Sequence, residues 1–152
     1  MAAAEFARQL ESDPAYVARR LAQDAAAREV EREVTADEAP LLAELRAAGA
    51  PAGSVYDFVR AGGAPPAAVP VLVAHLGRAH HPRVREGIVR ALTVPHARDH
   101  ALGPLVAAYE TEPDPDQRWV LANALAVLAP FSEVHGLPGI AEYRPLFTRP
   151  WT

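Results

Sequence analysis

Two histidines in the sequence, His96 and His100, have the spacing of a metal-binding pair. Residues four apart lie on the same face of a helix, so both imidazoles would point toward one ion. The neighbourhood of this pair holds no third ligand, and His80 and His81, which precede a proline, are equally isolated. We therefore interpret all four as polar residues of helix connections, and we predict neither a metal nor another cofactor.

Acid–base or nucleophilic catalysis would need a carboxylate beside a cleft or an activated hydroxyl. The acidic candidates are Asp57, Glu86, Asp116 and Glu133. Each is explained as a helix-surface or first-turn residue, where a carboxylate stabilises the helix dipole. The only serines all stand at expected helix starts, without a nucleophile elbow around them: Ser12, Ser54 and Ser132. The sequence predicts a protein that is not an enzyme and has no catalytic residues.

The elements that position these side chains are expected to be helices. Half of the 152 residues are hydrophobic, but only 7% are aromatic. Much of the hydrophobic half is alanine, which favours helices, whereas the β-branched and aromatic residues that sheets require are sparse. We predict an all-α protein of about one domain, with a single elongated core.

Charge and cysteine content restrict the partners and the location. The formal net charge is −4, which makes nucleic acid an unlikely partner, because nucleic acid is bound mainly by neutralising its phosphates with a basic surface. The sequence contains no cysteine, which excludes disulfides and suits a reducing compartment. No apolar run approaches the roughly 18 residues that span a bilayer. We expect a soluble, cytoplasmic protein without a membrane partner.

Capping signals place the first helices. Asp13 and Pro14 predict an N-cap and a first helical residue, and neither glycine nor proline interrupts the stretch that follows as far as Val34. Thr35 and Glu38 have the spacing of a capping box, which predicts that a new helix starts there. The chain is therefore divided into an N-terminal helical extension over 1–34, paired helices over 35–130 and a capping segment over 131–152.

The paired helices repeat one pattern, with pairs expected over 35–62, 65–94 and 100–130. Three prolines precede two consecutive apolar residues, at separations of 30 and 34 residues: Pro40, Pro70 and Pro104. Four positions of one second helix recur 33 residues later, with Pro82, Arg85, Ile88 and Leu92 repeated as Pro115, Arg118, Leu121 and Leu125. A period of this length is typical of helical solenoids.

The sequence from His81 to Arg85, followed by Ile88, Ala91 and Leu92, resembles the second helix of a HEAT repeat. Asp114-Pro115 with Arg118, Ala122 and Leu125 resembles the next copy. The resemblance covers residues 66–130 well and 36–62 weakly. It implies a right-handed α-solenoid of about three hairpins with N-terminal helices and a C-terminal cap. It also implies that Arg85 and Arg118 link neighbouring repeats through carboxylates or loop carbonyls.

The same resemblance bears on function. Families of this architecture are typically scaffolds, adaptors, inhibitors or maturation factors, and a minority are enzymes, such as alkylpurine DNA glycosylases. Two alternatives to a binding protein therefore stay open. One is a HEAT-like enzyme that acts on nucleic acid. The other is a structural protein that self-associates through the polar helix over 14–34.

Helix geometry predicts a binding surface. If Val84, Ile88 and Leu92 face the core, the outward row holds Glu86 and Arg90, followed one repeat later by Trp119 and Asn123. In a solenoid this row lines the inner surface that binds partners. Aromatic and guanidinium groups dominate such interfaces. We predict a non-catalytic protein–protein interaction module with the binding residues Arg83, Glu86, Arg90, Trp119 and Asn123.

The C-terminal segment leaves two alternatives for the tryptophan in that row. Tyr143, Phe147 and Trp151 are spaced to dock this segment onto the last hairpin, because a terminal repeat requires a cap. The docked segment would either cover Trp119 or leave it exposed for a partner.

Overall fold

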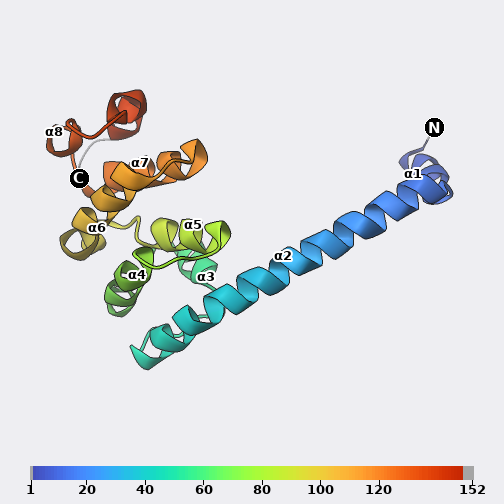
Figure 1. Ribbon diagram of the computed structural model, residues 1–152, viewed down its shortest axis with the longest axis horizontal. Coiled ribbons are helices and arrows are strands. Elements are labelled where there is room, and N and C mark those ends of the chain that lie inside the picture. Colours follow the sequence, from blue (N-terminus) through green and yellow to red (C-terminus); the bar gives the residue numbers. More distant parts are fainter. Residues whose placement is uncertain (1, 149–152) are drawn as a thin grey trace. The chain divides into compact units, whose positions relative to one another are not determined.

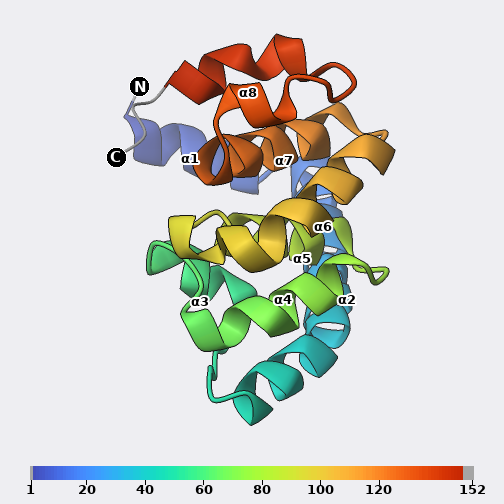
Figure 2. The ribbon, with the colours of Figure 1, turned by 90° about the vertical axis from the view of Figure 1, so that its left-hand side faces the viewer.

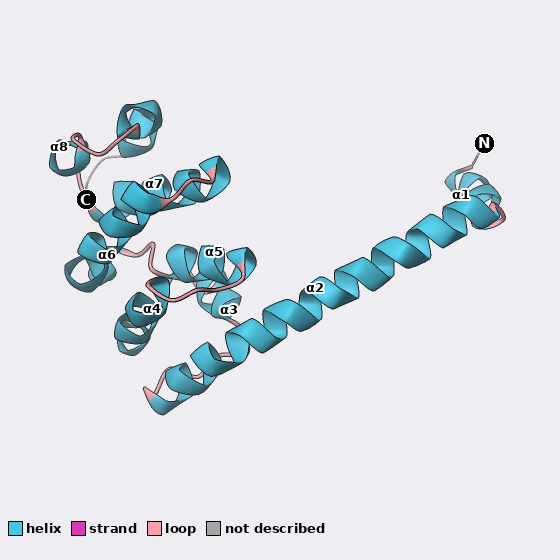
Figure 3. Ribbon diagram, in the orientation of Figure 1, coloured by secondary structure: helices cyan, strands magenta, loops and turns pink. Residues whose placement is uncertain are grey.

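A computed structural model describes the structure of residues 2–148 of the protein. These residues form helices joined by loops, without a strand (Figure 3), which confirms the predicted all-α class. The chain divides into two compact units, Met1–Ala36 and Asp37–Thr152, called here the first and the second unit. None of the described helices combines the length and the apolarity needed to cross a bilayer.

The first unit contains α1 (Ala3–Glu11) and the beginning of α2 (Pro14–Ala47). Asp13 caps α2 as predicted, because its Oδ1 accepts a hydrogen bond of 2.9 Å from the backbone N–H of Ala15. The apolar face of this part of the helix is narrow. Every residue from 18 to 33 is exposed, and Leu21 has an exposed fraction of 61%.

The predicted helix start at Thr35 is wrong, because α2 continues through this residue without a break. The predicted capping box does not form, and Glu38 instead contacts another helix. Its buried carboxylate accepts a hydrogen bond of 2.5 Å from the backbone N–H of Val55. Pro40 then lies inside the helix instead of near its start. The boundary between the two units falls after Ala36 and therefore within α2, whereas the predicted boundary was after residue 34.

Helix α3 (Val55–Arg60) begins directly after Ser54, where a helix start was predicted. Ser54 is the N-cap of a capping box in which the Asp57 carboxylate accepts hydrogen bonds from the backbone N–H groups of Gly53 and Ser54, at 2.9 and 3.2 Å. Two glycines with positive φ, Gly62 and Gly63, end this segment. This backbone conformation is strained for residues with a Cβ atom, which explains the glycines.

The next hairpin consists of α4 (Val69–Leu76) and α5 (Pro82–Ala91), and a 3₁₀ turn, η1 (Pro66–Ala68), leads into α4. The hairpin after it consists of α6 (Arg98–Thr111) and α7 (Pro115–Leu128), and the turn η2 (Pro95–Ala97) leads into α6. The pair predicted over 100–130 therefore begins two residues earlier than expected, and Pro104 lies inside α6. Because Asp99 occupies the first turn of α6, its carboxylate interacts favourably with the helix dipole.

Within the second unit these helices form two layers, in which α3, α5 and α7 lie side by side and α4 lies beside α6 (Figures 1 and 2). The core lies between the layers. It contains Val84, Ile88 and Leu92, which confirms the core face predicted for α5. The other helices contribute further fully buried apolar residues: Leu41, Leu45, Leu72, Leu105, Leu121, Leu125 and Leu128.

Three arginines tie successive elements together. Arg85 of α5 forms an ion pair of 3.3 Å with Glu112, which follows α6. Arg98 donates to the carbonyl of Leu128 at 2.5 Å, at the end of α7. Arg118 donates to the carbonyl of Pro138 at 2.9 Å. The carboxylate and loop-carbonyl partners expected for Arg85 and Arg118 are therefore present.

The C-terminal segment consists of α8 (Phe131–Val134) and the 3₁₀ helix η3 (Ile140–Thr148), which packs against α7. Phe147 meets the ring of Phe131 edge-on, with ring centroids 5.4 Å apart. Tyr143 meets Tyr109 in the same way at 6.3 Å. The contact of Tyr143 with Tyr109 confirms that Tyr143 is docked onto the last hairpin. Phe147 instead packs within the C-terminal segment, since Phe131 belongs to α8, and Trp151 lies outside the described residues.

Candidate functional site

The predicted binding residues occupy two neighbouring helices, α5 and α7. On α5, Arg90 pairs with Glu86 at 2.8 Å, and both side chains are about one third exposed. Arg83 is exposed one turn earlier. The structure brings Glu86 and Arg90 into direct contact, while Trp119 and Asn123 lie on the adjacent helix.

Trp119 is exposed, because the C-terminal segment leaves 44% of its surface accessible. Within the described part of the second unit, no other large hydrophobic side chain is as exposed. Asn123, one turn further along α7, is half-buried. The described part of the C-terminal segment, up to Thr148, therefore leaves this tryptophan exposed.

A tyrosine that the sequence analysis did not single out lies beside the α5 residues. The hydroxyl of Tyr56 on α3 donates to the backbone carbonyl of Arg83 at 2.7 Å. Burial raises the pKa of Tyr56, and the negative charge of Glu86 raises it further. This tyrosine therefore joins α3 to α5 next to the predicted binding residues.

A second cluster was missed altogether at the sequence level. Asp37 and Glu44 lie seven residues apart on α2, which places them on one face about two turns from each other. Two imidazoles connect these carboxylates: His75 from α4 and His80 from the connection between α4 and α5. We call these four residues the histidine relay.

The relay is a continuous chain of contacts. Oδ2 of Asp37 lies 2.7 Å from Nδ1 of His80, and Nε2 of His80 lies 3.0 Å from Nδ1 of His75. Nε2 of His75 contacts Oε2 of Glu44. The side chains of His75 and His80 are only 2% and 6% exposed, whereas that of Glu44 is 45% exposed. The relay therefore has a buried centre, and both of its ends reach the surface, Asp37 with 26% and Glu44 with 45% of the side chain exposed.

Neighbouring groups bind both carboxylates of the relay. The backbone N–H of His81 donates to Oδ2 of Asp37 at 3.1 Å. Nη1 of Arg78 lies 3.2 Å from Oε1 of Glu44 and 3.1 Å from Nε2 of His75. Hydrogen bonds from His75 and then Arg78 lower the pKa of Glu44 below its usual value. Glu44 is therefore a carboxylate in contact with an imidazole ring nitrogen.

Sequence reasoning missed the relay because its members are far apart in the chain. His75 lies within the apolar stretch Val-Leu-Val-Ala-His-Leu of α4 and meets a carboxylate 31 residues earlier. His80 meets one 43 residues earlier. A histidine on the buried face of a helix was the available signal, since a buried imidazole requires hydrogen-bond partners.

The two histidines with the spacing of a metal pair do not both lie in a connection between helices, because His100 belongs to α6. His96 in η2 and His100 in α6 are both exposed. In the stretch from 2 to 148, no group of three or more histidine, cysteine, aspartate or glutamate side chains is arranged to hold a metal ion. Two of the acidic candidates for catalysis stabilise the fold. Asp57 caps α3, and Glu133 forms an ion pair of 2.6 Å with Arg98.

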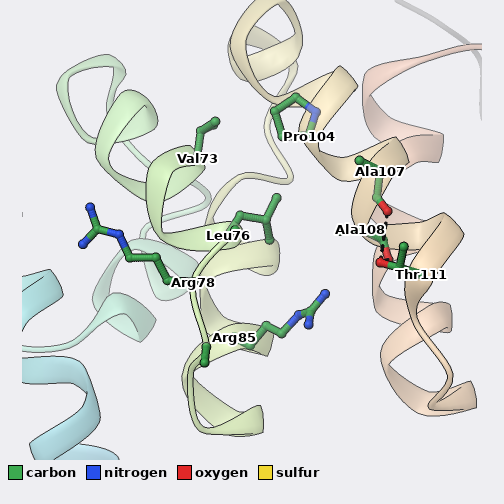
Figure 4. A pocket seen from close by; sticks show the side chains of 10 residues that line it. Val73, Leu76, Arg78, Arg85, Pro104, Ala107, Ala108 and Thr111 are labelled. Atoms are coloured by element: carbon green, nitrogen blue, oxygen red, sulfur yellow. Dashed lines mark hydrogen bonds between the residues drawn. The ribbon is translucent and has the colours of Figure 1, made fainter.

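A groove of about 580 Å³ lies between the end of α4 and helix α6 (Figure 4). Most of its lining is small or apolar, and its two charged lining residues are Arg78 and Arg85. Figure 4 shows Arg85 directed toward α6 and Arg78 directed away from it. No carboxylate is among the described lining residues.

Comparison with known proteins adds no relative. No protein-family model matches the chain, and neither a curated protein nor a solved structure shows significant similarity to it. The HEAT-like repeat therefore stays a prediction from the sequence pattern.

Proposed function

We propose that this chain is a non-catalytic protein–protein interaction module, an adaptor, scaffold or inhibitor, built as a short right-handed α-solenoid of HEAT-like hairpins. The order of contacts in the second unit supports the solenoid, since α3, α5 and α7 pack in sequence and α4 packs on α6. In such an arrangement α5 and α7 present equivalent residues on one surface. The proposed binding surface consists of Arg83, Glu86, Arg90, Trp119 and Asn123.

The observation that carries this proposal is the exposure of Trp119. A docked C-terminal segment packs on the same helix and still leaves 44% of this side chain accessible. Leaving so much of a large aromatic surface in water forgoes the free energy that its burial would provide. Tryptophan is also among the residues most enriched at the energetic centres of interfaces. A partner that covers Trp119 would recover this free energy.

The charges around this position favour a partner with both apolar and charged groups. Glu86 and Arg90 on the neighbouring helix are paired, yet each remains about one third exposed. Such half-exposed pairs usually contribute to orientation and association rate more than to affinity. We therefore expect Trp119 to carry most of the binding free energy, and Arg90 to contribute to specificity.

The test begins with a partner captured by the wild-type chain, which is then purified for affinity measurements. Trp119→Ala is expected to weaken the Kd about 30-fold or more, because hot-spot residues contribute about 2 kcal/mol or more. Arg90→Glu is expected to weaken it less. Phe6→Ala is the matched control, since Phe6 is an exposed aromatic residue of the first unit. If folded Trp119→Ala and Arg90→Glu variants bind with unchanged affinity, the proposed surface is wrong.

A second candidate function, self-association, is favoured by the first unit. Phe6, Leu21 and Val30 are exposed there by 55%, 61% and 40%, and a second copy of the chain would cover them. Light scattering on the wild type and on Leu21→Ser distinguishes the two functions. A dimer that becomes monomeric on this substitution supports self-association. A wild type that stays monomeric at every concentration tested contradicts it.

A further inference from the structure

The first unit contains a pocket of about 320 Å³ between the end of α1 and the first turns of α2. Its apolar lining consists of Tyr16, Val17 and Leu21. Tyr16 and Val17 are half-buried, whereas Leu21 has an exposed fraction of 61%. Val17 and Leu21 are four residues apart and therefore lie on the same face of the helix. The pocket thus offers an apolar surface that the described residues leave partly uncovered.

The charged residues of the lining are Glu11, Arg20 and Asp24. Arg20 and Asp24 are four residues apart, so they project from the same side of α2, about 6 Å apart along its axis. Both are exposed. A positive charge on the helix is therefore followed one turn later by a negative charge, and the exposed Leu21 stands between the two in the sequence.

Arg20 has a partner within the unit, but the contact is loose. Its Nη1 lies 3.9 Å from Oε1 of Glu11, and the two side chains are 58% and 62% exposed. Ion pairs between such exposed side chains contribute little to stability, because water screens the charges and pairing orders two flexible side chains. Arg20 therefore loses little free energy when it pairs with a different carboxylate.

A second copy of the chain supplies such a carboxylate if its α2 runs antiparallel to the first. A two-fold axis level with residue 22 reverses the order of the charges, so Arg20 of each copy lies opposite Asp24 of the other. The same axis brings the two Leu21 side chains together at the centre of the contact. A two-fold contact uses the same surface on both copies. The lining of this pocket meets that condition, because it is complementary to itself in charge and in hydrophobicity.

We propose that the chain forms a two-fold dimer in which this pocket receives Leu21 of a second copy, with an ion pair between Arg20 and Asp24 on each side of it. This inference rests on the self-association candidate and specifies its contact. Covering Leu21 removes apolar surface from water and provides the attraction. The two ion pairs select the antiparallel orientation, because a parallel arrangement in register would place like charges opposite each other.

The dimer is expected to be weak and sensitive to salt. The contact involves about two turns of α2 in each copy, whereas stable complexes usually bury about 1,200 Å² or more in total. It should therefore dissociate on dilution. Added salt should promote the dissociation, because it screens exposed ion pairs.

Analytical ultracentrifugation of the full chain over a range of concentrations measures the Kd of the dimer. Arg20→Asp places two acidic side chains opposite each other on both sides of the contact, and Asp24→Arg places two basic ones there. We expect each substitution to raise the Kd about tenfold, because two ion pairs are replaced by repulsion at the same time. The double variant, Arg20→Asp with Asp24→Arg, exchanges the two charges and should restore the wild-type Kd.

Arg19→Asp is the matched control, because it changes the net charge by the same amount as Arg20→Asp. Arg19 is exposed and does not line the pocket, since one residue earlier in the helix points about 100° away. Its Kd should equal that of the wild type, and circular dichroism should show equal helix content in all variants.

Two results would overturn the proposal in distinguishable ways. A wild-type dimer whose Kd is unchanged in Arg20→Asp, or is not restored in the double variant, would show that the contact lies elsewhere, while self-association itself stands. A wild type that stays monomeric at every concentration tested would contradict both the contact and the self-association candidate.

Discussion

Gly87 marks the closest approach of α3 to α5. A Cβ atom at this position would lie 2.5 Å from Cγ1 of Val55 and 2.8 Å from Cε2 of Tyr56. Both neighbours are held in place, since Val55 is fully buried and the hydroxyl of Tyr56 is bonded to the carbonyl of Arg83. The absence of a side chain at one residue thus sets the distance between two helices.

Substituting Gly87 tests this close approach. Gly87→Ala is expected to lower the free energy of unfolding by about 1–3 kcal/mol, because the added methyl group overpacks the contact. Gly103→Ala is the matched control in α6. A Cβ atom there would meet nothing within 4 Å, and replacing a helical glycine with alanine should stabilise by about 0.5–1 kcal/mol. Equal effects of both substitutions in urea unfolding would refute the interpretation of Gly87.

At the scale of the element, α3 is short and depends on its N-terminal contacts. Six residues are too few for a helix that is stable alone. Its first N–H groups are bound by Glu38 from α2 and by Ser54. The capping box adds Asp57, whose carboxylate binds the backbone N–H groups that precede the helix. The position of α3, and with it that of Tyr56, therefore depends on side chains at its beginning.

The capping carboxylate predicts an acid-sensitive contribution to stability. Hydrogen bonds from Arg60, and then from the backbone of Gly53 and Ser54, lower the pKa of Asp57 below its usual value of 3.8. Because the folded-state pKa is lowered, the stabilisation is fully present above the unfolded-state pKa. It is lost as the pH falls from there through the folded-state pKa. In urea unfolding between pH 2 and 5, the free energy of unfolding should decrease less toward low pH in Asp57→Asn than in the wild type. An unchanged slope would exclude Asp57 as a source.

At the scale of the whole molecule, the two units differ in how their helices are stabilised. The second unit has a continuous core, and its hairpins are joined by Arg85, Arg98 and Arg118. In the first unit, α1 has no buried residue, and α2 is exposed from 18 to 33. Helical hydrogen bonds without buried apolar contacts open readily, because local stability depends on such contacts.

Hydrogen exchange measures this difference. Backbone amides of residues 18–33 should exchange through local unfolding, well before the amides of α5 and α7. The core amides should exchange only through opening of the second unit, with a free energy close to that of global unfolding. Equal protection in both units would show that the first unit is stabilised by contacts beyond those described here.

The sequence by itself determined the elements of this protein. The alanine content and the helical spacing predicted the all-α class and the core residues, because these depend on the periodicity of a single helix. Ser54 predicted the start of α3 for the same local reason. The helix start predicted at Thr35 was wrong, because a capping signal only favours a helix start. The Glu38 carboxylate instead accepts a hydrogen bond from a backbone N–H 17 residues away. Local signals thus predict a helix more reliably than its ends.

Only the tertiary structure decided which residues meet. It left 44% of the surface of Trp119 exposed, although η3 packs against the same helix. It brought His75 and His80 between two carboxylates of α2, over separations of 31 and 43 residues. Local periodicity specifies which face of a helix is buried, but it does not specify which polar side chain of another helix lies opposite. That pairing follows from how the helices pack, so the sequence could indicate a buried histidine in α4 but not the carboxylate that it contacts.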